Sequence, residues 1–210
     1  GAGKSTLMNV LFGLYDADGG QILLDDEPVT FAGPGDAMAA GIGMVHQHFM
    51  LVPTFTVLEN VMLGAEGGPL LARGAAETRA ELLDLSTAYG LEVDPDAKVG
   101  ALAVGLQQRV EILKALRRGA RILILDEPTR GIDVGAKQEI YTLISRLASQ
   151  GVSIIMISSE MPEVLAMSHR LLVISDGSIA GELQAEEATQ DKIMKMIVGE
   201  KKNKDVVGVR

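Results

Sequence analysis

Residues 121–127, RILILDE, are the strongest indication of the fold class, because a continuous apolar run ends there in two adjacent carboxylates. Such a run is typical of a strand that is buried on both faces of a parallel sheet. Binding sites of sheets of this kind lie at the carboxyl ends of the strands. We therefore expect Asp126 and Glu127 to lie at a functional edge. The alternative is a strand that simply ends in acidic residues at the surface.

Strands and helices alternate on both sides of this stretch, which predicts an α/β fold with a mainly parallel sheet. Residues 51–117 are mostly helical in pattern, so we expect a helical subdomain inserted between two strands of the sheet. Residues 1–200 would form one domain and residues 201–210 a flexible tail. The remaining expected strands are 21–24, 43–47, 152–158, 171–174 and 178–183, and the expected helices flanking the sheet are 4–14, 34–41, 137–147, 162–167 and 189–198.

Composition excludes several classes of protein. The chain has 210 residues, a formal net charge of −9 and no cysteine, so disulfides, cysteine-ligated zinc and cysteine nucleophiles are excluded. An acidic chain is a poor general binder of nucleic acid, and we expect no nucleic-acid partner. No apolar run approaches the roughly 20 residues that a membrane-spanning helix needs.

The first residues, GAGKST at 1–6, match the second half of the phosphate-binding pattern G-x-x-x-x-G-K-[ST]. Backbone N–H groups of Gly1, Ala2, Gly3 and Thr6 would surround phosphate oxygens at a helix N-terminus. Lys4 would reach the β- and γ-phosphates and Ser5 would bind Mg²⁺. The first glycine of the pattern would precede residue 1, so we expect the chain to be a fragment. The alternative is a glycine-rich helix start without function.

The two motifs together favour a nucleotide site. Asp126 would hold Mg²⁺ through its water shell, and Glu127 would act as the general base toward the attacking water. The half-motif alone would leave the functional and the structural interpretation equally open. A strand that ends in two carboxylates, far downstream in the same chain, shifts the balance to the nucleotide interpretation.

The segment LAVGLQQR at residues 102–109 resembles the LSGGQ signature of ABC transporter ATPases. Three further features agree in order and spacing with that family. Gln47 resembles the glutamine of its Q-loop, Asp133 the acidic residue of its D-loop, and residues 156–164 occupy the place of its switch. The resemblance covers nearly the whole chain and implies a P-loop NTPase fold that uses ATP and Mg²⁺.

The resemblance also implies partners. Two such cassettes pair head to tail, so Ala103, Val104, Gly105 and Asp133 would contact the nucleotide held by a second cassette. Gln47 would contact the Mg²⁺ and the attacking water. A groove near Gln47 and residues 49–60 would receive a membrane permease, which in turn works with a substrate-binding protein. The expected location is the cytoplasmic face of a bacterial cell membrane.

Within the family, residues 46–64 and 104–116 are similar to the N-terminal cassette of tandem importers of ribose-like sugars and nucleosides. Residues 126–141 and 158–165 are instead similar to the C-terminal cassette of the same proteins. We therefore expect a hybrid of the two cassettes, joined near residues 123–129. The expected function is an ATPase subunit of an importer of sugars or nucleosides.

Two departures from the family pattern open alternatives. Ala103 stands where the family has serine, and Ser159 stands where it has the switch histidine. Losing the signature hydroxyl removes a hydrogen bond to a charged group, worth about 1.5–3 kcal/mol. Ser159 occupies the position of a catalytic residue of the family. Because a hydroxyl cannot take the role of the imidazole, we expect slow ATP hydrolysis. The second alternative is therefore a degenerate cassette that binds nucleotide and acts as a regulatory partner. The third alternative is a soluble ABC-type ATPase.

Overall fold

The centre of the molecule is a three-stranded parallel sheet. The computed structural model describes residues 3–46, 49–64 and 71–207. Within them, strands β3 (Ile42–Val45), β4 (Ile122–Asp126) and β5 (Ser153–Ile157) pair in the order β3-β4-β5. Both pairings are parallel. The apolar run of residues 121–126 thus forms the middle strand, and the α/β class is confirmed.

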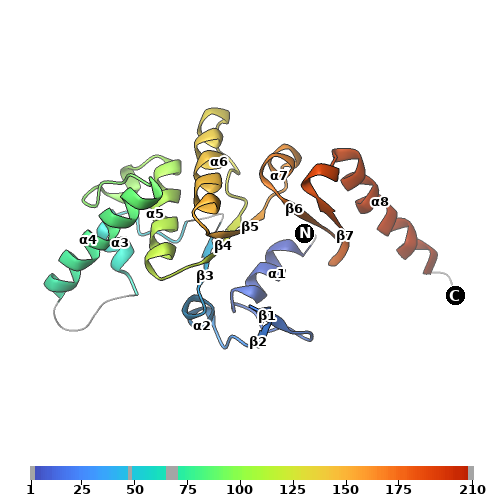
Figure 1. Ribbon diagram of the computed structural model, residues 1–210, viewed down its shortest axis with the longest axis horizontal. Helices are drawn as coiled ribbons and strands as arrows, with labels where there is room; N and C mark the ends of the chain where they lie inside the picture. Colours follow the sequence, from blue (N-terminus) through green and yellow to red (C-terminus); the bar gives the residue numbers. More distant parts are fainter. Residues whose placement is uncertain (1–2, 47–48, 65–70, 208–210) are drawn as a thin grey trace.

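The middle strand separates two hydrophobic clusters because its side chains alternate between the faces of the sheet. Leu123 and Leu125 belong to a cluster that includes α5 (Val104–Arg117) and α6 (Val134–Ser149). Ile124 points to the other face, into a cluster with α1 (Lys4–Leu11) and α2 (Pro34–Ala39). All three strand side chains are fully buried. Helices therefore cover both faces, as in other parallel sheets (Figure 1).

The chain between β3 and β4 is helical, as expected. It forms α3 (Val57–Met62), α4 (Leu71–Tyr89), the short 3-10 helix η1 (Val99–Ala101) and α5. A capping box between Thr56 and Glu59 begins α3. The buried side chains of α3, α4 and α5 join the same cluster as one face of the sheet. Since the core is shared, the subdomain boundaries at residues 51 and 117 stay a prediction.

Two antiparallel hairpins accompany the parallel sheet in the described part of the chain. Strands β6 (Arg170–Ser175) and β7 (Ser178–Gln184) form the hairpin expected from Asp176 and Gly177, whose φ angles of 46° and 77° suit a tight primed turn. Strands β1 (Ile22–Leu24) and β2 (Glu27–Val29) form the other. The second strand of that pair was not predicted, since Pro28 weakens a strand pattern.

The last elements of the chain are α7 (Met161–Met167), the 3-10 helix η2 (Ala185–Glu187) and α8 (Gln190–Val207). Helix α8 continues to Val207, so most of the segment from residue 201 is helical, and the flexible tail expected there stays a prediction. The segment lacks an apolar period, yet its lysines are good helix formers. Helix α1 is also shorter than expected, ending at Leu11 before Gly13, whose φ is 74°.

Candidate functional site

The start of α1 meets the end of β4. The Ser5 hydroxyl Oγ donates to Oδ1 of Asp126 at 3.4 Å, although 121 positions separate the two residues. Gly3 occupies the N-cap of α1 with a φ of 92° and offers no side-chain cap. The first turn of α1 carries no acidic residue. The unpaired N–H groups and the positive end of the helix dipole therefore face the same edge as the Asp126 carboxylate.

Gly3 is also pressed against a second element. A Cβ at Gly3 would lie 3.3 Å from the Cα of Gly177 in the β6–β7 turn. The N-terminal end of α1 accordingly lies beside this hairpin in Figure 1. Both the left-handed backbone and the close approach require glycine at this position.

The residues at this edge fit a magnesium-bound phosphate. A hydroxyl and a carboxylate oxygen are the hard ligands that Mg²⁺ prefers, and Mg²⁺ takes its remaining ligands from phosphates and water. Lys4 is the first residue of α1, where the N–H groups lack intrahelical partners. No group of three or more His, Asp or Glu side chains able to hold a metal occurs among the described residues. Three residues that the sequence assigned to this site lie outside the described ranges: Gly1, Ala2 and Gln47.

Glu127 and Ser159 are in direct contact. The hydroxyl and the backbone N–H of Ser159 donate to Oε2 of Glu127 at 3.0 and 3.1 Å. Glu127 has a φ of 51°, a left-handed conformation that is uncommon outside glycine. Its N–H donates to the carbonyl of Ile157 at 2.8 Å, which fixes it against the end of β5. The sequence-assigned general base and the switch position thus form one unit.

His46, which follows β3, also belongs to this edge. Val45 pairs with Leu125, so His46 comes opposite Asp126. Burial lowers the pKa of His46, and the Asp126 charge opposes this shift. The ring packs edge-on against Phe12, the C-cap of α1, with centroids 6.3 Å apart. The sequence interpretation considered His46 beside Gln47 and read it as incidental, although parallel pairing of the two strands would have placed it here.

The signature residues lie elsewhere. Ala103 is the N-cap of α5 and supplies no side-chain hydrogen bond there, and Val104 is half exposed. Gly105 occupies the same first turn. In Figure 1 the β3–β5 sheet lies between α5 and the start of α1. The structure therefore does not bring these three residues to the Ser5–Asp126 edge of the same chain.

Asp133 has a structural role that the sequence did not reveal. Its carboxylate oxygen Oδ1 accepts a hydrogen bond from the Ala136 N–H at 3.0 Å, which caps α6. Such caps stabilise helices by about 0.5–2 kcal/mol. The capping role is sufficient to explain an aspartate at this position.

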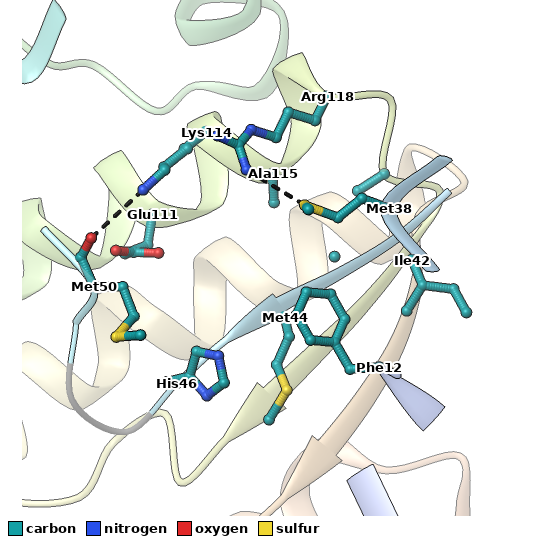
Figure 2. A pocket seen from close by; sticks show the side chains of 12 residues that line it. Phe12, Met38, Ile42, Met44, His46, Met50, Glu111, Lys114, Ala115 and Arg118 are labelled. Carbon is teal, nitrogen blue, oxygen red and sulfur yellow. Dashed lines mark hydrogen bonds between the residues drawn. The ribbon is translucent and has the colours of Figure 1, made fainter. Parts of the chain in front are cut away.

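A cavity of about 170 Å³ lies between α1, α2, β3 and α5. Apolar side chains form most of its wall, and charged groups of α5 form one side (Figure 2). Burial raises the pKa of Glu111, and the positive charge of Lys114 opposes this shift. One carboxylate oxygen of Glu111 has no hydrogen-bond partner among the described atoms. Lys114 donates to the Met50 carbonyl at 3.5 Å, and Arg118 to the Met38 sulfur at 3.3 Å.

Comparisons with known proteins agree with this geometry. The model of the ABC transporter family matches residues 1–130. The guanosine import ATP-binding protein NupO of Bacillus subtilis is 44% identical over 199 residues, covering 95% of this chain and 39% of that protein. The ribose import ATP-binding protein RbsA 1 of Rubrobacter xylanophilus is also 44% identical, covering 92% and 40%. The chain thus spans about two fifths of the length of these relatives.

Solved structures show the same fold. The cbiO1 structure from Clostridium perfringens, part of an ABC transporter complex, superposes with a TM-score of 0.75 at 26% identity, covering 96% of this chain and 79% of that one. The dimeric cassette MJ0796 bound to ADP and phosphate gives 0.68 at 26% identity, covering 88% and 81%. Because the family model matches well over half of its length, this chain belongs to the ABC transporter family, and it has the fold of the family's ATP-binding cassettes.

Proposed function

We propose that the chain is part of the ATP-binding and ATP-hydrolysing subunit of an importer of simple sugars or nucleosides. The observation that carries this proposal is the contact between Ser5 and Asp126, which unites the helix start with the acidic strand end. The names of the relatives support an importer, since both are import ATP-binding proteins, one for guanosine and one for ribose.

The residues at this edge divide the work on ATP. Lys4 and the first N–H groups of α1 would bind the phosphates, while Ser5 and Asp126 would hold Mg²⁺ directly or through water. Bound Mg²⁺ would supply charge neutralisation between the phosphates. Glu127 accepts a proton from the attacking water through the carboxylate oxygen that Ser159 leaves free. Gln47 would complete this set.

A second cassette would supply the other half of the site. The exposed first turn of α5, with Ala103, Val104 and Gly105, lies across the sheet from the chain's own phosphate edge. It is therefore free to contact nucleotide bound to another cassette, as is Asp133 at the start of α6. The dimeric state of the similar cassette MJ0796 supports head-to-tail pairing.

The cavity between α1, α2, β3 and α5 is the proposed docking place for a membrane permease. Met50, from the stretch assigned to such a groove, lines it (Figure 2). The unpaired oxygen of Glu111 offers an acceptor to a hydrogen-bond donor of the permease. No helix in the described ranges is long and apolar enough to cross a bilayer. We place the protein at the cytoplasmic face of the membrane, with a substrate-binding protein as an indirect partner.

A degenerate, regulatory cassette is the second candidate, and the Ser159–Glu127 contact favours it. A hydroxyl cannot replace an imidazole in holding the γ-phosphate and the attacking water together. ATP turnover by the natural full-length protein, compared with its Ser159→His and Glu127→Gln variants, separates the two. Measurable turnover that Glu127→Gln abolishes supports the ATPase. Binding without turnover, with activity gained in Ser159→His, supports the regulatory cassette.

Two further sequence hypotheses have direct tests. Purification of the protein with a permease rather than with nucleic acid would exclude a soluble ABC-type ATPase. The hybrid of two cassettes, joined near residues 123–129, is tested by sequencing the genomic locus. An intact tandem gene that lacks this junction would exclude the hybrid.

A further inference from the structure

We propose that Lys137 is a positioning residue for Glu127, acting through an ion pair with Glu160 that holds Ser159 against the Glu127 carboxylate. The inference rests on the proposed function, because it assigns Glu127 the role of general base. It concerns a network behind the site that the sequence motifs do not include. The residues of this network come from α6, from the end of β5 and from α7.

The ion pair joins two helices. Lys137, in the first turns of α6, donates through Nζ to both carboxylate oxygens of Glu160, with 2.6 Å to Oε1. The Lys137 side chain is only 17% exposed, so this pair is better shielded from solvent than a surface ion pair. The hydrogen bond to Glu160 is the main reason why the pKa of Lys137 is raised.

A second anchor lies on the other side of Ser159. The Ser158 hydroxyl donates to Oε2 of Glu163, a buried carboxylate with 2% of its surface exposed. The same hydroxyl accepts the N–H of Glu160 at 2.9 Å. Both chain neighbours of Ser159 are therefore fixed, one by α7 and the other by α6.

The two anchors explain why Ser159 can give two hydrogen bonds to one carboxylate oxygen. A loop residue that was free to rotate would lose conformational entropy on forming both bonds. With Ser158 and Glu160 held, the N–H and the hydroxyl of Ser159 already point at Oε2 of Glu127. Both hydrogen bonds from Ser159 go to Oε2, so Ser159 leaves Oε1 of Glu127 without a hydrogen bond from this loop.

The ion pair also links Glu127 to the segment that would meet a second cassette. Lys137 lies one helical turn after Asp133, and its N–H donates to the Asp133 carbonyl at 3.0 Å. A displacement of the start of α6 would therefore pull on Glu160 and on Ser159. Closure of a cassette pair around nucleotide can in this way change the orientation of the general base.

Amide hydrogen exchange at Ser159 tests the inference without requiring ATP turnover. In Lys137→Met we expect the Ser159 amide to exchange about tenfold faster, the effect of losing one charge-assisted hydrogen bond. Glu127→Gln should produce a similar increase. Lys195→Met, which breaks the exposed Lys195–Asp191 pair on α8, is the matched control and should leave Ser159 unchanged. The charge-exchanged pair Lys137→Glu with Glu160→Lys should restore slow exchange.

Unchanged exchange at Ser159 in Lys137→Met, with the fold intact, would overturn the inference. If that variant unfolds, faster exchange at Ile124 in the core will reveal it, and Glu160→Gln then gives the decisive measurement on the exposed side of the pair. Where turnover is measurable, Lys137→Met should lower kcat and leave the KM for ATP unchanged. Failure to bind ATP would contradict the proposed function. Amide exchange at Ser159 would still test whether the Lys137–Glu160 ion pair holds Ser159 against Glu127.

Discussion

The Ser5 hydroxyl lies 3.4 Å from Oδ1 of Asp126, so the first turn of α1 and the end of the central strand meet at one point. This contact depends on the whole sheet, because β4 is held between β3 and β5 and α1 packs on its Ile124 face. These two side chains are the ones that would hold a Mg²⁺ ion beside bound phosphate.

Replacing Asp126 by asparagine should remove most of the magnesium dependence of ATP affinity. One hydrogen bond or ligand contact to a charged group is worth about 1.5–3 kcal/mol, which corresponds to a loss of about tenfold or more. Titration calorimetry with and without Mg²⁺ measures it. Asp84→Asn, an equal charge change at an exposed position of α4, should leave the affinity unchanged. Equal effects of both substitutions would contradict a specific magnesium role.

Restoring the family serine at residue 103 should stabilise the protein. Ala103 is the N-cap of α5 and makes no side-chain hydrogen bond. In Ala103→Ser the hydroxyl can accept a free N–H of the first turn, which should raise the free energy of unfolding by about 0.5–2 kcal/mol. Urea denaturation measures the change. Ala76→Ser, inside α4 and exposed, is the control and should slightly lower stability.

Gly43→Ala should destabilise the sheet. A Cβ at Gly43 would approach Cβ of Ala115 to 2.9 Å and Cβ of Ala120 to 3.0 Å, so β3 and α5 would have to separate. Overpacking of this kind costs about 1–3 kcal/mol. Gly35→Ala is the control, since a Cβ there meets nothing within 4 Å and should be neutral or stabilising. A thermal denaturation series that ranks the two variants in the opposite order would refute this packing argument.

Glu111→Gln should change how stability depends on pH. Burial raises the pKa of Glu111 above its ordinary value of 4.5, so the folded chain binds this proton more tightly than the unfolded chain. Its stabilising contribution is complete below pH 4.5 and is lost as the pH rises through the folded-state pKa. The variant should therefore gain stability relative to the parent protein as the pH rises from mildly acidic to neutral.

Glu59→Gln provides the opposite control for this pH series. The Thr56 backbone N–H lowers the pKa of Glu59, so this carboxylate contributes stability above its ordinary value of 4.5. That contribution is lost as the pH falls through the folded-state pKa. Urea unfolding at several pH values measures how the free energy of unfolding of each variant, relative to the parent protein, depends on pH. The slope of this dependence should have opposite signs for the two variants. Parallel slopes would contradict the burial of a charge at Glu111.

The central strand and its two carboxylates could be predicted from the sequence because a short continuous apolar run rich in isoleucine is typical of a strand covered on both faces. The Ser159–Glu127 contact was also within reach: Asp126 pairs with Ile157, so Glu127 and Ser159 both lie just beyond paired strand ends. What was missing was knowledge that β4 and β5 are neighbours. The sequence of one strand does not show which other strand it pairs with.

Other features depend on packing between distant elements and leave no local pattern. The cavity beside Glu111 arises where α1, α2, β3 and α5 meet. Helix α5 begins at Val104, although Ala103 at its N-cap gives no capping signal in the sequence. The ion pair between Lys137 and Glu160 joins α6 to α7 across the end of β5. These contacts form only when distant elements pack together, so no local sequence pattern predicts them.

Binding of ATP to the natural full-length protein with and without Mg²⁺, measured by titration calorimetry alongside Lys4→Met, tests the proposed nucleotide site. We expect saturable ATP binding that Mg²⁺ strengthens and that Lys4→Met weakens by about tenfold or more, since a charged contact to phosphate is lost. Absence of magnesium-dependent binding for every nucleoside triphosphate would contradict it.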